Sequence, residues 1–358
     1  MARVIVGMSG GVDSAVAAYL LREAGHEVIG VTLRTWESGG SRCCEIDDAR
    51  ETARMLSIPF HVLSCVSTFQ KQVEAPFAEA YLRGVTPNPC VVCNRAVKWE
   101  WMLYASRLFQ ADAVATGHYA GVAHLPNGRF AVRRAGDERK DQSYMLCRLT
   151  QEQLSRTMFP LQDLTKEEVR YLAERTGLPS AHRPDSQEVC FVAQGSYADY
   201  IASRTDRPLP GPGRFVDEQR RVLGTHRGVF RYTVGQRRGL GLALGYHAYV
   251  TAIHPERNEV VIGRESSLYR GEILCHDLIF QSTPGLSPGE SLRAAVKIRY
   301  AHEGAEASVQ RTGADTLRIG FDRPVRAPAP GQTAVLYDAD GCVIAAGTIA
   351  AAPDPPCG

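Results

Sequence analysis

Two segments of this sequence carry cysteines close to polar residues, and the residues of the first predict a reactive thiol. The first runs Asn88-Pro89-Cys90-Val91-Val92-Cys93-Asn94, and a helical pattern follows from about Arg95. Cys93 should therefore lie just before a helix N-terminus, where the helix dipole stabilises a thiolate. The side chains of Arg95 and Lys98 should act in the same direction. Since an unperturbed thiol titrates near pH ~8.5, we expect a lowered pKa and raised reactivity for Cys93.

The second segment runs Pro184-Asp185-Ser186-Gln187-Glu188-Val189-Cys190-Phe191. Cys190 follows a polar turn and precedes an apolar run, and an isolated cysteine of this kind is more often a core residue than a reactive one. Four further cysteines lie in apolar surroundings and are expected in the core: Cys65, Cys147, Cys275 and Cys342. The adjacent pair Cys43-Cys44 is poorly arranged to hold one metal, and we expect it near the nucleotide without a defined role.

A glycine-rich hexapeptide, Ser9-Gly10-Gly11-Val12-Asp13-Ser14, lies between the first predicted strand and the first predicted helix. Its backbone can turn tightly, and the helix N-terminus behind it favours phosphate oxygens. Asp13 fits beside phosphate if a cation bridges them, and Mg²⁺ prefers such oxygen ligands. The loop has neither a Walker A ending nor a GxGxxG pattern. The plain alternative is a capped turn without a ligand.

This hexapeptide resembles the pyrophosphate loop of the N-type ATP pyrophosphatases, which cleave ATP between its α- and β-phosphates and adenylate an oxygen of the substrate. Other segments extend the resemblance: Thr116–Tyr119, Lys140–Tyr144, the two cysteine segments and Tyr232–Arg237. These motifs occur in family order over most of the chain, and together they resemble the tRNA-specific 2-thiouridylases.

The resemblance implies that Cys93 is the nucleophile and that Cys190 carries a persulfide. ATP with Mg²⁺ would adenylate the 2-oxygen of the wobble uridine, and a persulfide delivered by a sulfur-donor protein would supply the sulfur. Cys93 would then attack the persulfide to release its terminal sulfur, or form a disulfide with Cys190 after transfer. ATP contacts are implied for Gly7, Met8, Ser9, Gly10, Gly11, Val12, Asp13, Ser14, Leu33 and Gly117. Leu33 fits a plain strand residue equally well.

The same resemblance implies contacts to the RNA. Asn88, Pro89 and Cys90 correspond to positions that face the target base, and a further set corresponds to positions that face tRNA: His118, Lys140, Asp141, Gln142, Arg299, Tyr300 and Gln332. Ordinary solvent exposure, or strand pairing for Tyr300, is the alternative for these positions. A uridine inside an anticodon loop must be extruded to reach a nucleotide site.

The chain departs from the family pattern at Cys90, where better-known members have an aspartate that is a candidate general base. Cys90, Cys93 and Cys190 are three thiolates that could hold a four-iron four-sulfur cluster with one iron open to sulfide, as several related tRNA thiolases do. The alternative is that Cys90 is only a redox neighbour of Cys93.

Hydrophobic periodicity indicates how these residues are positioned. Strands are predicted at 4–6, 28–33, 60–63 and 113–116, and helices at 12–24, 47–56, 69–82 and 97–109. Alternation of strands and helices favours an α/β fold with a doubly wound parallel sheet. Prolines and glycines around 208–213 resemble a linker, and short alternating runs follow. We expect a pyrophosphatase domain at 1–203, a central tRNA-binding domain at 204–270, a C-terminal β-barrel at 271–352 and a tail at 353–358.

The composition is that of an ordinary globular protein of 358 residues with a net charge of +2. Without a signal peptide or a long apolar run, the chain is expected to be cytoplasmic, with tRNA as partner and neither membrane nor DNA. Nine arginines crowd 204–238 against three acids, which favours RNA-backbone contact over an ordinary solvated surface. They are Arg204, Arg207, Arg214, Arg220, Arg221, Arg227, Arg231, Arg237 and Arg238.

Two other functions remain open from the sequence alone. An amide-forming ATP pyrophosphatase would need the glycine-rich loop but neither Cys93 nor Cys190, so a Cys93→Ser enzyme would keep its activity. A non-catalytic tRNA-binding or sulfur-carrier protein would need Cys190 and the arginines but not Asp13. ATP-to-AMP turnover that depends on tRNA would exclude this second alternative.

Overall fold

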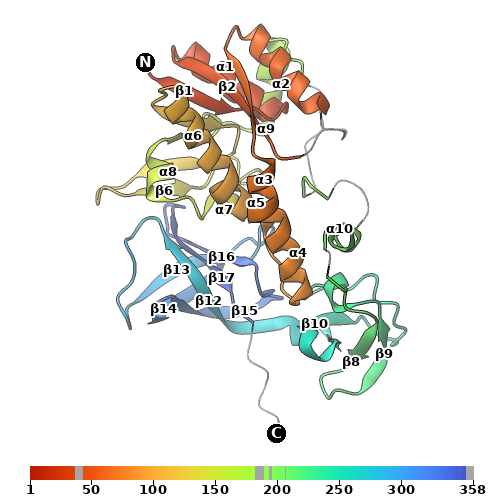
Figure 1. Cartoon of the computed structure of the whole chain (residues 1–358). Helices are drawn as coiled ribbons and strands as arrows, with labels where there is room; N and C mark the ends of the chain where they lie inside the picture. Colours follow the sequence, from red (N-terminus) through yellow and green to blue (C-terminus); the bar gives the residue numbers. More distant parts are fainter. Residues whose placement is uncertain (37–42, 182–188, 193–195, 206, 352–358) are drawn as a thin grey trace.

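The computed structural model describes residues 1–36, 43–181, 189–192, 196–205 and 207–351. Its N-terminal part is built on a five-stranded parallel sheet in the order β3-β2-β1-β4-β7 (Figure 1). The strands are β1 (Arg3–Gly7), β2 (Glu27–Arg34), β3 (Phe60–Ser64), β4 (Ala113–Thr116) and β7 (Thr157–Met158). Each of the four strands predicted from periodicity is found, with ends shifted by at most one residue.

Helices cover both faces of this sheet, which confirms the doubly wound α/β prediction. One face packs against α1 (Val12–Glu23), α2 (Cys43–Met55) and α9 (Lys166–Arg175), and the other against α6 (Glu100–Leu108) and α8 (Gln151–Ser155). Alternate residues of β1 feed the two cores, since Ile5 belongs to one and Val4 and Val6 to the other. All three are fully buried, as expected for a central parallel strand.

Two long helical runs cross the molecule beside the sheet. The first consists of α3 (Val66–Phe69), the π-helical η1 (Gln70–Glu74) and α4 (Ala75–Leu82), and the second of α5 (Pro89–Cys93), the π-helical η2 (Asn94–Trp99) and α6. The second run begins at Pro89, so the prediction of a helix beginning near 95–97 was wrong. Asn88 caps it by accepting a hydrogen bond from the Val91 amide, and proline suits the first helical position.

The remaining elements of the N-terminal part are short. They are the antiparallel pair β5 (Gly121–His124) and β6 (Phe130–Arg133), and the helices α7 (Ser143–Leu146) and α10 (Tyr197–Arg204). Phe77 and Tyr81 of α4 pack with Ile201 of α10 and Phe230 of the next part of the chain. This small core fastens the central part to the end of α4, which reaches down from the sheet in Figure 1.

The central part is a four-stranded sheet in the order β10-β11-β8-β9. Its strands are β8 (Gly213–Val216), β9 (Val222–His226), β10 (Tyr249–His254) and β11 (Glu259–Gly263), with 3₁₀ turns η3 (Val229–Arg231), η4 (Pro255–Arg257) and η5 (Glu265–Leu268). Phe215, Val250 and Val260 are fully buried and form the centre of its core. A small central domain thus lies between the two larger ones in the sequence and beside the barrel in space (Figure 1).

The C-terminal part is a closed six-stranded barrel, which confirms the predicted β-barrel. It contains β12 (Tyr269–Phe280), β13 (Ser291–Lys297), β14 (Ala305–Gly313), β15 (Thr316–Arg326), β16 (Thr333–Tyr337) and β17 (Val343–Ile349). The buried Gln281 donates hydrogen bonds to the carbonyls of Cys147 and Leu149 across the interface with the N-terminal part. Arg148 forms an ion pair with Asp277 at 2.6 Å. These buried polar contacts fix how the barrel docks under the sheet (Figure 1).

None of the helices in the described ranges has the length and apolar character needed to cross a membrane.

Candidate functional site

The glycine-rich loop joins β1 to α1 at the carboxyl edge of the sheet, beside the point where strand order reverses between β1 and β4. Open α/β sheets bind ligands at such a point. Hydrogen bonds within the loop hold its conformation. Ser14 donates its hydroxyl to the Gly11 carbonyl at 3.0 Å, and the Ser9 amide donates to Ser14 Oγ at 3.1 Å. Gly10 has a φ of 79°, which a residue with a Cβ rarely adopts. This preformed cradle fits a pyrophosphate group.

Gly117, at the end of β4, presses against the back of this loop. A Cβ at that position would lie 2.5 Å from the Asp13 carbonyl carbon and 2.6 Å from the Ser14 nitrogen. These are backbone atoms of the first turn of α1 and cannot move without shifting the loop. The predicted adenosine contact of Gly117 stays a prediction, but the position has a defined structural reason to be glycine.

Asp13 already has a cationic partner in the chain. Its Oδ1 accepts hydrogen bonds from Tyr119 Oη at 2.8 Å and from Lys166 Nζ at 2.7 Å. The side chain of Lys166 is 8% exposed, so this pair is largely shielded from water. Sequence reasoning proposed a bridging Mg²⁺ for Asp13 and missed Lys166, because α9 lies far along the chain and carries no local signal. The loop therefore presents a neutralised carboxylate and a buried ammonium group beside its phosphate cradle.

Cys93 is buried rather than poised at a helix end. It is 8% exposed and packs with Cys65, Phe69 and Val97, with Leu33 from the end of β2 against the same cluster. Burial raises the pKa of Cys93 to about 12, so the predicted low pKa was wrong. The physical reason is that Cys93 lies one turn inside the helical run, where desolvation outweighs the favourable charge of Lys98.

The three cysteines singled out from the sequence converge in the structure. The charges of Cys90 and Cys190 both raise the pKa of the Cys93 thiol. The charge of Cys190 also raises the pKa of Cys90, where burial is the larger cause. The three thiols are free, and Cys190 is the exposed one. Phe191 anchors its segment, because its ring lies 5.5 Å from that of Phe69 and 5.1 Å from that of Phe77.

Cys65 belongs to the same place, which the sequence did not reveal. It was expected to be a core residue, and it is fully buried, like Cys147. However, it lies directly after β3, and its charge also raises the pKa of Cys93. Burial raises the pKa of Cys65 to about 11. Cys275 and Cys342 are buried in the barrel, as expected for core residues.

Lys98 is the positive charge of this region. Its ammonium group lowers the pKa of both Cys90 and Cys93 and also disfavours protonation of His118. The π-helical η2 explains the placement, because residues five apart in a π-helix lie on one face, and Lys98 follows Cys93 by five.

His118 lies directly after Gly117, at the same edge of the sheet as the glycine-rich loop. Burial lowers the pKa of His118 to about 3, with Lys98 as the second cause, so the imidazole is neutral at physiological pH. Its Nδ1 is 2.7 Å from Thr116 Oγ1, and its ring lies 5.8 Å from that of Trp99. A neutral ring can hydrogen-bond a nucleobase without adding charge.

The predicted base-facing residues begin the second helical run. Asn88 is the cap, Pro89 is buried, and Cys90 is half-buried. Gln332 reaches this segment from the barrel, donating its side-chain amide to the carbonyls of Thr86 at 3.0 Å and Pro87 at 3.3 Å. The amide that was predicted to face tRNA therefore also holds the barrel against the base-facing segment.

The other predicted tRNA contacts differ in accessibility. Asp141 is buried, and its Oδ1 and Oδ2 accept hydrogen bonds from the Ser143 amide and hydroxyl, which argues against direct RNA contact by this side chain. Gln142 accepts a hydrogen bond from the Tyr119 amide. Tyr300 lies beyond the end of β13 and is 40% exposed, so strand pairing does not explain it. Its ring lies edge-on to that of Tyr144, 6.2 Å away.

The arginines of residues 204–238 have more carboxylate partners than the three acids within that stretch could provide. Six of the nine arginines lie within 4.0 Å of a carboxylate, mostly one outside the stretch: Arg204 with Glu74, Arg207 with Glu79, Arg214 and Arg220 with Glu259, Arg221 with Asp217, and Arg231 with Asp199. Within the described residues, Arg227, Arg237 and Arg238 have no such carboxylate. The last two line an open cavity of about 510 Å³ in the central domain.

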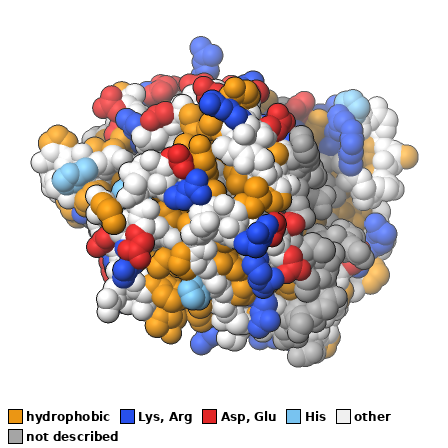
Figure 2. All heavy atoms as spheres, turned by 90° about the horizontal axis from the view of Figure 1, so that it is seen from above, with side chains coloured by type: hydrophobic (Ala, Val, Ile, Leu, Met, Phe, Trp, Pro, Cys, Tyr) orange, Lys and Arg blue, Asp and Glu red, His pale blue; other side chains and the backbone are white. Residues whose placement is uncertain are grey.

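The surface seen from above the N-terminal part carries no block of one charge. Acidic and basic side chains lie interspersed there (Figure 2), in keeping with the small net charge. Electrostatic attraction of RNA must therefore come from a few local groups rather than from the whole field of the protein.

Among the described residues, no group of three or more metal-ligating side chains is assembled. The side chains of Cys43 and Cys44 and residues 182–188, with Asp185, lie outside the described residues.

Three family models match the chain in succession. The tRNA methyl transferase HUP domain matches residues 2–194, the tRNA methyl transferase PRC-barrel domain matches 200–264, and the aminomethyltransferase β-barrel domain matches 272–349. The boundaries proposed from the sequence, 203/204 and 270/271, stay predictions.

Full-length relatives match as well. The chain is 46% identical to the tRNA-specific 2-thiouridylase MnmA of Lachnoclostridium phytofermentans, over 98% of this chain and 99% of the relative. It is 45% identical to the enzyme of the same name from Moorella thermoacetica, over 96% and 98%. Among solved structures, the U34-tRNA thiolase NcsA from Methanococcus maripaludis, with its [4Fe-4S] cluster, aligns with a TM-score of 0.36 at 21% identity, over 57% of this chain and 64% of that one.

Proposed function

This chain belongs to the tRNA-specific 2-thiouridylase family, the ATP-dependent tRNA sulfurtransferases, and we propose that Cys93 and Cys190 carry its sulfur-transfer step. The observation that carries the proposal is convergence at one edge of the sheet. The glycine-rich loop follows β1, Leu33 is the last residue but one of β2, Cys65 follows β3 and Gly117 follows β4. Leu33 and Cys65 pack against Cys93, so the thiols adjoin the nucleotide cradle.

The activation step belongs to the loop. ATP and Mg²⁺ would be held by the backbone of Ser9–Ser14 and by Asp13, and the uridine 2-oxygen would attack the α-phosphate, with pyrophosphate leaving. The ammonium group of Lys166, 2.7 Å from Asp13, adds a positive charge next to the departing phosphates. The uridine then carries AMP as a leaving group on C2.

The sulfur step balances through the two cysteines. The terminal sulfur of a Cys190 persulfide attacks C2 and displaces AMP, which leaves the RNA joined to Cys190 through a disulfide. The Cys93 thiolate attacks Cys190 Sγ, the sulfur–sulfur bond to the RNA breaks, and 2-thiouridine leaves. Cys93 and Cys190 are then a disulfide, and two electrons from an external thiol reduce it.

The unequal exposure of the two thiols supports this division of roles. Cys190 is exposed, so a persulfide on a donor protein can reach it. Cys93 is buried with a pKa of about 12, so at physiological pH it is almost entirely protonated and reacts slowly with solutes in the resting state. Deprotonation must therefore follow from substrate binding or from the approach of Cys190, and Lys98 is the cation that stabilises the resulting thiolate.

A cluster-dependent variant of the same thiolation would use Cys90, Cys93 and Cys190 as ligands. Among the described residues these three thiols are not assembled as a metal site, and burial raises the pKa of Cys90 and of Cys93, which disfavours their thiolates. We therefore propose the persulfide route, with Cys90 as a redox neighbour of Cys93.

Reconstitution tests the proposal. Purified protein with ATP, Mg²⁺, tRNA and a persulfide-loaded donor protein should yield 2-thiouridine, measured by mass spectrometry of the nucleosides, without added iron. Cys93→Ser should give none, whereas Cys342→Ala, which alters a buried barrel cysteine, should match the unaltered protein. Absence of product both in air and after anaerobic reconstitution with iron and sulfide would refute the proposal. Product formed only after that reconstitution would select the cluster variant.

A further inference from the structure

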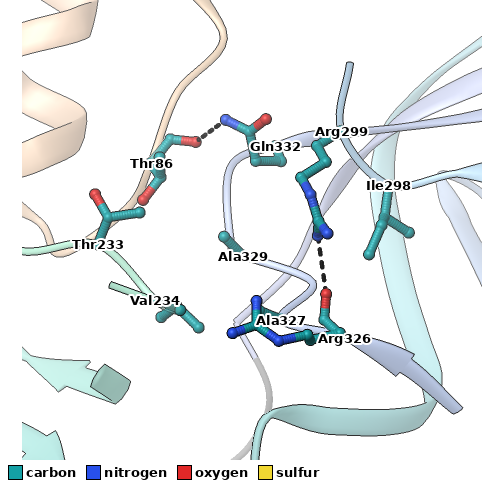
Figure 3. A pocket seen from close by; sticks show the side chains of 10 residues that line it. Thr86, Thr233, Val234, Ile298, Arg299, Arg326, Ala327, Ala329 and Gln332 are labelled. Carbon is teal, nitrogen blue, oxygen red and sulfur yellow. Dashed lines mark hydrogen bonds between the residues drawn. The ribbon is translucent and has the colours of Figure 1, made fainter. Parts of the chain in front are cut away.

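We propose that Arg326 binds the phosphodiester of a nucleotide adjoining the wobble uridine in a cavity where the three parts of the chain meet, together with Arg299, a position that the family resemblance already implies to face tRNA. The cavity measures about 340 Å³ (Figure 3). It is lined by Thr86, Thr233, Val234, Gly235, Ile298, Arg299, Arg326, Ala327, Ala329 and Gln332. This inference rests on the proposed function, because it takes the target base to lie at Asn88–Cys90.

The cavity is assembled from all three parts. Thr86 comes from the loop after α4, Thr233 and Val234 from the central part, and both arginines from the barrel (Figure 3). Tyr249, Leu268 and Ala327 pack together just beside it and join the central part to the barrel. A cavity at the lower end of the usual ~300–1,000 Å³ range accommodates one nucleotide rather than a longer segment.

Two arginines of the barrel line this cavity together. Arg299 donates from Nη1 to the backbone carbonyl of Arg326 at 2.8 Å, which fixes its side chain in the cavity (Figure 3). Burial and the neighbouring charge of Arg326 lower the pKa of Arg299 below its usual value. Holding like charges side by side costs free energy, and an anion between them removes that cost.

The protein compensates only part of this charge. Arg326 forms an ion pair with Glu265 at 3.0 Å, but Glu265 is 55% exposed, and Arg326 also lies over the ring of Tyr249 at 5.3 Å. An exposed pair of this kind contributes little and exchanges readily for a stronger anion. Arginine binds phosphate through two parallel N–H donors, and Thr86 contributes a hydroxyl to the lining of the same cavity.

The position of the cavity identifies which phosphate it takes. Gln332 lines the cavity and donates to the carbonyls of Thr86 and Pro87, the two residues that precede Asn88. The cavity and the base-facing segment are thus separated only by this hydrogen-bonded contact. If the wobble uridine is turned into the site at Asn88–Cys90, the backbone on one side of it enters the cavity.

The test measures binding of an anticodon stem-loop RNA by fluorescence anisotropy, without ATP or sulfur donor. Arg326→Gln should weaken binding about 5–30-fold and reduce the slope of log affinity against log salt by about one. Arg323→Gln is the matched control, since Arg323 is exposed on the same strand and does not line the cavity; its affinity should stay within about twofold. Glu265→Gln should tighten binding, because it removes the carboxylate that competes for Arg326.

A second arm distinguishes an RNA phosphate from free phosphate. Methylphosphonate replaces, one at a time, the two phosphodiesters that flank the wobble uridine. At one of them the neutral linkage should weaken binding by the unaltered protein and have no further effect on Arg326→Gln. Three results would each overturn the inference. The first is an equal loss of RNA affinity in Arg326→Gln and Arg323→Gln, and the second is weaker RNA binding by Glu265→Gln. The third is that each methylphosphonate weakens binding to Arg326→Gln as much as it weakens binding to the unaltered protein. Because these experiments measure RNA binding and not thiolation, their result can still be interpreted if the proposed function fails.

Discussion

The nucleotide loop and the thiol site lie at the same edge of the sheet but are built in different ways. The loop is one continuous hexapeptide whose serines hydrogen-bond within it, and Ser9 and Ser14 are five residues apart. The thiol site takes Cys65, the pair Cys90 and Cys93, and Cys190 from three separate segments, and Cys65 and Cys93 lie in an apolar cluster. The loop is polar and preformed, whereas burial raises the pKa of Cys65 and Cys93 and keeps them protonated.

This difference assigns separate tasks to the two regions. A loop that must bind a highly charged group benefits from fixed donors that need no rearrangement. Thiols that must react with one another, and not with solutes, benefit from burial that raises the pKa until the partner arrives. The two regions should therefore respond to substitution in separable ways, which the following experiments examine in order of decreasing expected effect.

The largest effect is expected from Cys190→Ser. Because Cys190 is the proposed persulfide carrier, formation of 2-thiouridine should fall at least ~10³-fold. Release of pyrophosphate from ATP in the presence of tRNA should continue, since the loop does not include Cys190. Nucleoside mass spectrometry and a pyrophosphate assay measure the two steps. Equal loss of both steps would mean that the two regions are not separable.

Gly117→Ala should damage the loop and leave the thiols unaltered. The new Cβ would lie 2.5 Å from the Asp13 carbonyl carbon, and such overpacking costs about 1–3 kcal/mol. We expect ATP to bind about 5–100-fold more weakly by calorimetry. Alkylation of Cys190 should keep its rate. Gly271→Ala, where no atom lies within 4 Å of the added Cβ, is the matched control. Unchanged ATP affinity in Gly117→Ala would show that the loop tolerates displacement.

Lys98→Met should reduce the reactivity of the thiols. Because Lys98 lowers the pKa of Cys93, its removal raises that pKa, and the thiolate fraction at any pH below it falls. Alkylation of Cys93 by iodoacetamide at pH 8 should slow about 3–10-fold, that is, half to one pKa unit. Mass spectrometry of the labelled peptides measures it. Lys71→Met, an exposed lysine on η1, should have no effect, and an equal rate in both variants would contradict the role of Lys98.

The smallest effect concerns His118, which directly follows the loop-contacting Gly117. Its folded-state pKa of about 3 lies below the unfolded value, so below about pH 6.5 only the unfolded chain takes up the proton. His118 therefore costs stability as pH falls, by about 1 kcal/mol between pH 6.5 and 5.5. His118→Gln should flatten this decline in urea unfolding, whereas His276→Gln, at an exposed barrel position, should not. A decline of unaltered steepness in His118→Gln would show that its ring is accessible to protons.

Much of the fold could be predicted from the sequence, because local periodicity records which face of an element is buried. The strands at the edge that holds the site were located within one residue, and the parallel sheet and barrel were expected. The start of the second helical run was missed, although Asn88-Pro89 carries a capping residue followed by proline. That signal was available in the sequence. It would have placed the expected helix N-terminus, and with it the favourable dipole, at Cys90 instead of Cys93.

The sequence by itself determined the chemistry: a glycine-rich loop for phosphate, paired cysteine segments for sulfur, and the order in which the chain presents them. Only the tertiary structure decided the charge states and partners. It buried Cys93, paired Asp13 with Lys166 and matched most of the central arginines with distant carboxylates. The physical reason is that a pKa or an ion pair depends on desolvation and on charges brought from elsewhere in the chain, and neighbouring letters do not record these.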